Sequence, residues 1–435
     1  MKPLMLLGGL HVDKRKVDDF LNPLRSPSTF MRVVGVFARY GLDRLRYSRG
    51  TDIGAGNALV AMLVYSLQKR HSEMWTDAPL VRLLGSRDQI DGAVIRRNGH
   101  DIAVRARRGV ILATGGFSGN PRMRHELALG FPHEFSVGFE GNTGDGITAA
   151  QSFGSDVDTR LASPGYWTPC SSIVESGVRR PVLYGYLDRG RPGVIAVDQS
   201  GKRFVNESNS YHDVGIALQH AGYAKGNFFH FVCDRTFVWH HGLGMIRPFR
   251  FSLRRYIKAD YIVVADSISE LASKMGVPAA ALSETVRRHN EYAKTGHDPE
   301  FGKGSTAYNR LFGHSRAAPN RNLAPIVKPP FVALRILPAT LGTAVGLQAN
   351  KDAQVLNRDG KPIAGLYACG NDMASVMRGR YPAGGITLGP AIAFAYRAAA
   401  HATFDQSQKA SAAPRLPDAM QRAEKDMKRG GGENA

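Results

Sequence analysis

Apolar and polar residues near the N-terminus alternate with the period of an α-helix. Ser26 and Pro27 form a pair that begins many helices, a side-chain cap followed by a proline in the first turn. The apolar residues that then share one face are Phe30, Val33, Val34 and Phe37. We expect a helix that ends near Arg46 and packs its apolar side on the core. Because Arg44 and Arg49 lie close to its end, a weak association with a membrane surface is the alternative.

The next apolar runs predict one more helix and then strands. Glycines at 54–56 begin the helix, and its expected core face carries Leu59, Met62, Leu63 and Leu67. A strand at 74–84 precedes a β-ribbon, which turns at Asn98-Gly99 between residues 92–95 and 102–106. The wholly apolar run 109–113 is bounded by glycines. Such a run is typical of a buried parallel strand whose C-terminal end meets a ligand.

Beyond residue 155 the alternation of strand and helix patterns fades. Residues 201–211 suggest a strand that ends in a polar loop, and 267–292 a helix interrupted at Val277-Pro278. The strand pattern returns at 330–337, a hairpin turn follows at Asp359-Gly360, and an Ala-rich helix runs through Phe394 and Tyr396. We therefore predict an α/β protein in two parts, 1–155 and 326–403, with an α+β domain inserted at 156–325. The tail, 404–435, has a composition typical of disorder.

Composition and charge exclude several classes of protein. The 435 residues include 57 basic and 37 acidic side chains, a formal net charge of +20, but the arginines are scattered and match no nucleic-acid module. A basic surface that attracts anionic ligands is the simpler interpretation. The cysteines are Cys170, Cys233 and Cys369, too far apart for a disulfide framework or a zinc site, so we expect no metal. No apolar run approaches the length of a membrane span, and we expect a cytoplasmic protein.

Glycine-rich turns are the candidate ligand contacts. The first, Ala113-Thr114-Gly115-Gly116, follows the apolar run at 109–113. The second spans 142–147, where Thr143 or Asp145 could cap a helix. The third combines 365–371, which ends in Gly370-Asn371, with 379–390 before the Ala-rich helix. Glycines let the backbone approach a flat or phosphorylated ligand, and a helix N-terminus offers free N–H groups to it.

In this order, the glycine motifs resemble those of the flavoprotein family that includes fumarate reductases, succinate dehydrogenase flavoprotein subunits and 3-ketosteroid dehydrogenases. The resemblance covers about residues 10–400. It is most specific towards the 3-ketosteroid Δ1-dehydrogenases, which carry similar Leu-Gly-Thr, Ala-Ser-Val-Met, Tyr-Pro-Gly-X-Gly and Asn-Glu-Ser-X-X-Tyr segments. Here these read 341–343, 374–377, 381–385 (with Ala383 for the first glycine) and 206–211. A fumarate reductase is disfavoured, because Pro382 stands where those enzymes place an arginine and their His-Thr pair is missing.

The resemblance implies an FAD-binding, Rossmann-like domain and an inserted substrate or capping domain. The residues expected to contact FAD are Ala113, Thr114, Gly115, Gly116, Asn142, Thr143, Asp145, Gly370, Asn371, Ile386, Thr387 and Leu388. The positive end of the helix after Gly385 would stabilise reduced flavin. The implied substrate is an apolar cyclic ketone such as a 3-ketosteroid, and the electron acceptor stays open.

The implied chemistry is removal of two hydrogens beside a ketone. The Tyr381 hydroxyl and the Gly385 backbone N–H would hold the ketone oxygen and stabilise the developing enolate. Tyr211 would remove the C2 proton, and flavin N5 would take the hydride. Because a free tyrosine titrates near pH 10, Tyr211 would need a neighbouring donor or a shifted pKa to act as the base.

One part of the family pattern has no counterpart here. Residues 1–60 contain no strand followed by Gly-x-Gly-x-x-Gly, so the Rossmann-like domain is expected to be incomplete. The family's further catalytic tyrosine in the N-terminal region has no counterpart either. Three origins fit: a truncated gene product, a mis-assigned start, or half of a split protein whose partner supplies the segment. The alternative function is a non-catalytic remnant that binds no FAD alone.

Overall fold

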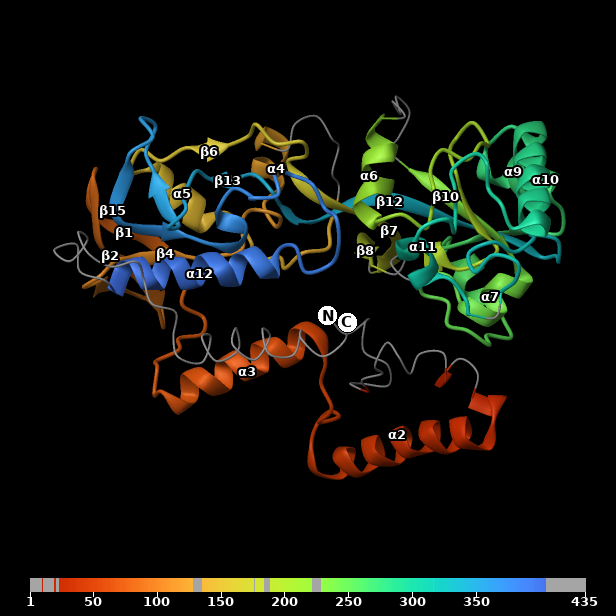
Figure 1. Ribbon diagram of the computed structural model, residues 1–435, viewed down its shortest axis with the longest axis horizontal. Coiled ribbons are helices and arrows are strands. Elements are labelled where there is room, and N and C mark those ends of the chain that lie inside the picture. Colours follow the sequence, from red (N-terminus) through yellow and green to blue (C-terminus); the bar gives the residue numbers. More distant parts are fainter. Residues whose placement is uncertain are drawn as a thin grey trace, which may run out of the picture. The chain divides into compact units, whose positions relative to one another are not determined.

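The computed structural model describes residues 10, 19–20, 23–127, 135–175, 177–183, 188–220, 228–315 and 317–403 (Figure 1). They fall into two compact units. The first unit comprises Met1–Asp77 and Trp167–Ala339, and the second comprises Ala78–Tyr166 and Thr340–Ala435. The expected disordered tail, 404–435, lies outside the described residues. Among the described helices, none is both long and apolar enough to cross a membrane.

The second unit is built on a twisted mixed sheet. Its strands run in the order β1 (Leu80–Ser86), β2 (Gln89–Arg97), β15 (Pro362–Ala368) and β14 (Gln354–Leu356), with β3 (His100–Arg105) on β2 and β4 (Val110–Leu112) on β15. The pair β4–β15 is parallel, while β2–β3 is an antiparallel ribbon. The ribbon turns where expected, because Asn98 and Gly99 adopt the positive φ values, 52° and 80°, that a two-residue hairpin loop needs.

Helices cover this sheet and close its core. They are α4 (Pro121–Leu127), α5 (Asp145–Gln151) and α12 (Leu388–Thr403), and short strands β6 (Val157–Asp158) and β13 (Gly346–Leu347) pair beside them. In Figure 1, α12 runs along the sheet. Its Phe394 packs against the core that includes Leu112, Ile147 and Leu366, and its Ala398 is fully buried. The predicted Ala-rich helix is therefore confirmed.

The first unit has its own sheet and core. The strand order is β8 (Val178–Val182), β7 (Gly165–Glu175), β12 (Phe331–Thr343), β10 (Phe229–Asp234) and β9 (Val194–Val197), and β11 (Val263–Ala265) also pairs with β12. The chain passes from one unit to the other within β7 and β12. β5 (Phe135–Ser136) pairs with β12 next to Thr340, within the second unit. Every residue of β9 and β10 is buried, as expected for central strands.

Helices of the first unit include the predicted cap at Ser26 and a further serine cap that was not predicted, at Ser267. Ser26 and Ser267 each accept a hydrogen bond from the third N–H of α2 (Pro27–Arg46) and α9 (Ile268–Met275), and the interruption at Val277-Pro278 separates α9 from α10 (Ala279–Thr295). The remaining helices are η3 (Pro23–Arg25), α3 (Ala55–Lys69), η4 (Asp188–Gly190), α6 (Tyr211–His220), α7 (Arg235–His241), α8 (Arg254–Lys258) and α11 (Ala307–Phe312).

Some sequence predictions were wrong. The strand expected at 74–84 begins only at Leu80, and 203–210 form turns rather than a strand. The apolar faces predicted for α2 and α3 are mostly exposed: Val33 is buried, but Phe37 is 42% and Met62 70% exposed. Periodicity reports which residues share a face, and it does not report whether another element covers that face.

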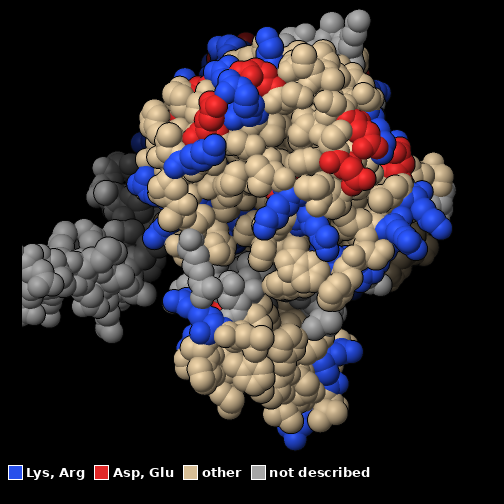
Figure 2. Space-filling view, turned by 90° about the vertical axis from the view of Figure 1, so that its right-hand side faces the viewer, with Lys and Arg blue, Asp and Glu red and all other residues tan. Residues whose placement is uncertain are grey.

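Surface charge is distributed over separate groups. On the face drawn in Figure 2, Lys and Arg side chains stand in several clusters with acidic groups among them. That face therefore shows no continuous basic stripe of the kind that follows a nucleic-acid backbone.

Candidate functional site

Two parallel strands carry glycine turns to the same edge of the sheet in the second unit. Leu112 at the end of β4 lies opposite Ala368 at the end of β15, and the Cys369 N–H donates to the Leu112 carbonyl at 3.0 Å. The chain then forms one turn at 113–116 and another, η5 (Gly370–Asp372), beside it. Ligands of α/β sheets bind at the carboxyl ends of such strands. The predicted parallel strand is thus confirmed, although Ile111 is 39% exposed rather than buried.

The first turn requires its glycines. Gly115 and Gly116 have φ values of +93° and +73°, which side chains rarely adopt. A Cβ at Gly115 would collide with the Asn142 side chain, and a Cβ at Gly116 would collide with the Thr343 hydroxyl and the Asn371 backbone. The turn therefore brings together residues from all the predicted glycine motifs.

Asp372 holds this turn. Its carboxylate accepts hydrogen bonds from the Thr114 N–H, from the Thr114 hydroxyl at 2.9 Å and from the Gly116 N–H at 3.0 Å. The side chain is completely buried. Burial raises the pKa of the Asp372 carboxyl, and the hydrogen bonds from Thr114 and Gly116 oppose that rise.

The second glycine motif joins the same cluster. The Gly144 N–H donates to the Gly116 carbonyl at 3.0 Å, and the Gly146 N–H donates to the Thr114 hydroxyl at 3.2 Å. The expected cap by Thr143 or Asp145 was wrong. The N-cap of α5 is Gly144 at φ +87°, which has no side chain to cap with, and the Thr143 hydroxyl donates to Asp145 at 2.7 Å instead.

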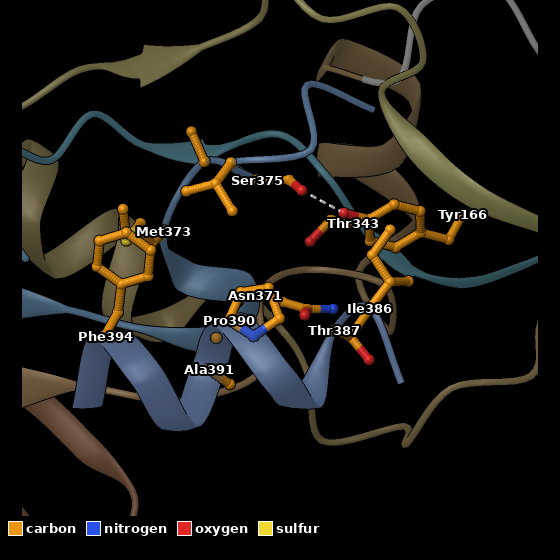
Figure 3. Close-up of a pocket in the computed structure, with 13 residues that line it drawn as sticks. Tyr166, Thr343, Asn371, Met373, Ser375, Ile386, Thr387, Pro390, Ala391 and Phe394 are labelled. Atoms are coloured by element: carbon orange, nitrogen blue, oxygen red, sulfur yellow. Dashed lines mark hydrogen bonds between the residues drawn. The ribbon is translucent and has the colours of Figure 1, made fainter. Parts of the chain in front are cut away.

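A hollow opens beside these turns (Figure 3). Of the predicted cofactor contacts, Gly370, Asn371, Ile386 and Thr387 line it. Thr343 also lines it: the residue is only 4% exposed, and its hydroxyl has no hydrogen-bond partner within the described part of the chain. A buried hydroxyl without a partner usually faces a water or a ligand.

The third glycine motif forms the open side of this region. Gly385 has φ +97°, and a Cβ on Gly384 or Gly385 would meet no atom within 4 Å. The Gly389 N–H donates to the Gly385 carbonyl at 2.8 Å, so helical hydrogen bonding starts here and α12 presents its N-terminus at this turn. Two other predicted cofactor contacts, Leu388 and Ala113, do not line the hollow and are exposed, Leu388 by 48%.

Tyr381 stands beside the hollow against a second tyrosine. Its ring meets that of Tyr166 edge-on, with centroids 5.2 Å apart and planes at 66°. The Tyr166 hydroxyl donates to the Ser375 hydroxyl (Figure 3), and both residues line the hollow. Burial raises the pKa of Tyr166, so it stays a neutral donor. Sequence reasoning missed Tyr166, and it missed Asp372, although an acidic residue directly after Asn371 at a strand end was a usable signal.

Tyr211, the candidate base, belongs to the first unit. It begins α6 and is 4% exposed. The Arg189 guanidinium lies 5.9 Å from the centre of its ring and donates to the Glu207 carbonyl at 2.8 Å. The guanidinium therefore lies over the ring of the candidate base in a cation–π contact.

The other candidate chemistries are metal binding and thiol reactivity. Within the described residues, no group of His, Cys, Asp or Glu side chains is placed to hold a metal ion. Cys170, Cys233 and Cys369 are all free and buried. Burial raises the pKa of the Cys170 thiol to about 12, so this thiol is unreactive at neutral pH.

Comparison with known proteins gives a consistent result. The sequence model of a family described as "FAD binding domain" matches residues 6–388. The 4-oxocyclohex-2-ene-1-carboxylate 5-dehydrogenase of Sinomonas cyclohexanicum is 35% identical over 390 residues, which are 88% of this chain and 65% of that protein. The 3-oxosteroid 1-dehydrogenase of Mycobacterium tuberculosis is 35% identical over 370 residues, 82% of this chain and 64% of that protein. The chain thus spans slightly less than two thirds of the length of each of these two relatives.

A solved structure resembles most of this chain. The 3-ketosteroid delta1-dehydrogenase of Sterolibacterium denitrificans superposes with a TM-score of 0.84 at 33% identity, over 92% of this chain and 73% of that one. These matches confirm the resemblance drawn from the glycine motifs and the mixed α/β, Rossmann-like fold class. FAD is the cofactor that they indicate.

Proposed function

Because the chain belongs to the FAD binding domain family, we propose that it dehydrogenates a ring ketone, a CH–CH oxidation in which FAD accepts the hydride. One observation carries this proposal. Around the hollow, the second unit brings together the glycine turns, the N-terminal turn of α12 and the buried Thr343 hydroxyl, which has no partner among the described residues. Tyr381 packs against Tyr166, which lines the hollow.

Several groups of the second unit are suited to hold part of a flavin. The backbone at 370–371 and the side chain of Thr387 would contact the ring system, and the unpartnered Thr343 hydroxyl would supply one hydrogen bond to it. The turn at 113–116 would carry the remainder of the cofactor, because its two glycines leave the backbone accessible. The start of α12 adds a positive potential at the open side of the hollow.

Two tyrosines would perform the proton chemistry. The Tyr381 hydroxyl and the Gly385 N–H would donate to the ketone oxygen and stabilise the negative charge that develops there. Tyr211 would take the proton from the carbon next to the carbonyl. A bound FAD would be the two-electron oxidant that accepts the hydride from the neighbouring carbon, so each of the two carbons would lose one hydrogen and the bond between them would become C=C.

The substrate class follows from what the third glycine turn lacks. Pro382 can donate no hydrogen bond and carries no charge, so this position offers no arginine-type contact to a carboxylate. Relatives include a dehydrogenase of a steroid and one of an oxocyclohexene carboxylate. We propose an uncharged cyclic ketone of the 3-ketosteroid type. The electron acceptor that reoxidises FAD is not specified by these residues.

A flavin titration followed by a substrate comparison tests this function. The purified chain should bind FAD near one equivalent, and a 3-ketosteroid should bleach the bound flavin under anaerobic conditions. 4-Oxocyclohexanecarboxylate is the matched charged substrate and should bleach it far more slowly. Faster bleaching by the carboxylate would overturn the substrate class, and no flavin binding would overturn dehydrogenation by this chain alone.

A second candidate function is that of an FAD-binding half that acts with a partner chain. It is supported by an apolar stripe on α12, where Leu388, Ile392 and Tyr396 recur at helical spacing and are 48%, 47% and 40% exposed. The partner would supply a strand–helix segment with the Gly-x-Gly-x-x-Gly pattern. Flavin binding that appears only when such a segment is added in trans would favour this candidate.

A further inference from the structure

We propose that Asp372 is a positioning residue of the flavin site, which holds the turn at 113–116 in the shape that FAD needs before the cofactor arrives. The inference rests on the proposed function, namely that FAD occupies the second unit. Asp372 itself does not line the hollow; Gly370 and Asn371, the two residues before it, do. Its role is therefore exerted through the residues that it binds.

The hydrogen-bond donors around Asp372 match a carboxylate at this position. The Thr114 N–H, the Thr114 hydroxyl and the Gly116 N–H all point at its two oxygens. A carboxylate is acceptor-only, so both oxygens receive these donors. An asparagine at this position would keep one oxygen and turn an NH₂ group towards the other donors.

The same contacts connect the glycine motifs to one another. The Thr114 hydroxyl donates to Asp372 and accepts from the Gly146 N–H at 3.2 Å, so the start of α5 is held by the same group. Gly116, the third partner, is the residue whose missing Cβ leaves room for Thr343 and Asn371. Loss of the Asp372 carboxylate would therefore loosen the turn on the side that meets the hollow.

The environment of Asp372 does not favour a role in stability. It is fully buried, and the ion pairs of the described residues include none to Asp372. The nearby Asp145 carboxylate adds repulsion. A buried charge without a cation is costly to the folded state, so a carboxylate that served only the fold would be better replaced by a neutral side chain.

The test compares D372N with D156N. Asp156 belongs to the same unit and also accepts a backbone N–H, from Val157 at 2.9 Å, and its other described hydrogen bond is from the Gln348 N–H to its carbonyl, away from the glycine turns. FAD affinity is measured by titrating the apo-proteins, and apo-protein stability by urea unfolding. We expect D372N to weaken FAD binding about tenfold or more while its urea midpoint stays equal or rises, because an unpaired buried charge is removed. D156N should leave both quantities near wild type.

Two further measurements keep the inference falsifiable. Amide hydrogen exchange at Thr114 and Gly116 should accelerate in apo-D372N, and T114V should weaken FAD binding in the same direction. Wild-type affinity in D372N, or a parallel loss of affinity and urea midpoint, would overturn the role of Asp372. A wild-type chain that binds no FAD would overturn the proposed function and this role together, whereas an unaffected D372N beside a flavin-binding wild type overturns the role alone.

Discussion

A buried ionic cluster in the first unit and a buried carboxylate in the second hold their charges in different ways. In the first unit, Arg203 is 1% exposed and lies 2.9 Å from Glu207 and 2.9 Å from Asp298, and the buried Lys303 lies 3.4 Å from Glu207. In the second unit, Asp372 is buried against N–H and hydroxyl donors, and the described ion pairs of that unit do not include it. The first arrangement neutralises its charges, and the second leaves a net charge inside.

The pKa values follow this difference. Burial would raise the pKa of Glu207, but Arg203 and Lys303 beside it lower the value to about 2. Burial raises the pKa of Asp372, and there the hydrogen bonds only oppose the rise. We infer that the ionic cluster belongs to the packing of the first unit, next to the loop that leads to Tyr211. The lone carboxylate is tolerated because it shapes the proposed flavin site.

The largest expected effect comes from removing the central cation of the first unit. R203M leaves Glu207 and Asp298 buried without their partner, so the free energy of unfolding should fall by about 3–5 kcal/mol. Urea unfolding followed by tryptophan fluorescence measures it, with exposed Arg287, paired with Glu284 and Glu291, as the matched control in R287M. Equal effects of R203M and R287M would show that the cluster contributes no more than a surface pair.

Tyr381 should matter for turnover and little for the fold. Y381F keeps the edge contact with Tyr166 but removes the donor to the ketone oxygen, so kcat should fall by about 10²–10³-fold with flavin content unchanged. Y396F is the control, since Tyr396 is 40% exposed on α12. Parallel losses of flavin and turnover in Y381F would contradict the oxyanion role.

Acid should weaken the first unit through its buried histidines. Burial, with Lys303 and Arg203 nearby, lowers the pKa of His289 from 6.5 to about 3. The folded state therefore favours the neutral ring. Its contribution is present above pH 6.5 and is lost as the pH falls from 6.5 towards 3.

Replacing His289 should flatten this pH dependence. H289Q keeps a donor for the Ala324 carbonyl, which His289 reaches at 3.0 Å, and should reduce the slope of stability against pH by up to about 1.4 kcal/mol per unit in that window. H297Q changes an exposed histidine of the same unit and should leave the slope as it is. An unchanged slope in H289Q would show that His289 is protonated in the folded protein.

The smallest expected effect distinguishes the role of Thr343 from that of Thr340, both in the second unit. T343V removes a buried hydroxyl without a partner in the described chain, so the apo-protein should lose no stability while FAD affinity falls by about 2–10-fold. T340V removes a hydroxyl that donates to the Gly342 carbonyl at 3.0 Å and accepts from its N–H, so stability should fall instead. The reverse pattern would place Thr343 in the fold and outside the cofactor site.

Local signals in the sequence predicted the elements well. The Ser26 cap, the turn at Asn98-Gly99 and the interruption at Val277-Pro278 each depend on neighbours along the chain. The glycine turns were found for the same reason, and their order identified the family. Exposure was predicted poorly for α2 and α3, because it depends on elements elsewhere in the chain.

The contacts that complete the candidate site could not be predicted from sequence, because their partners lie far apart along the chain. Thr114 and Asp372 are 258 positions apart, and Tyr166 and Ser375 are 209 apart. No periodicity or motif connects residues at such separations, and only the parallel pairing of β4 with β15 brings the first pair together. The partners of Asp372 and Tyr166 therefore emerged only from the packing, although the position of Asp372 directly after Asn371 was a signal in the sequence.

The distribution of cysteines gives the molecule a reporter in each unit. Cys170 and Cys233 are buried in the first unit and Cys369 in the second, directly before Gly370, and the sequence contains no other thiol. A thiol reagent can therefore modify the chain only when a unit opens. The order in which these three residues are labelled in dilute urea would show which unit opens first, and protection of Cys369 by FAD would report cofactor binding without any catalytic assay.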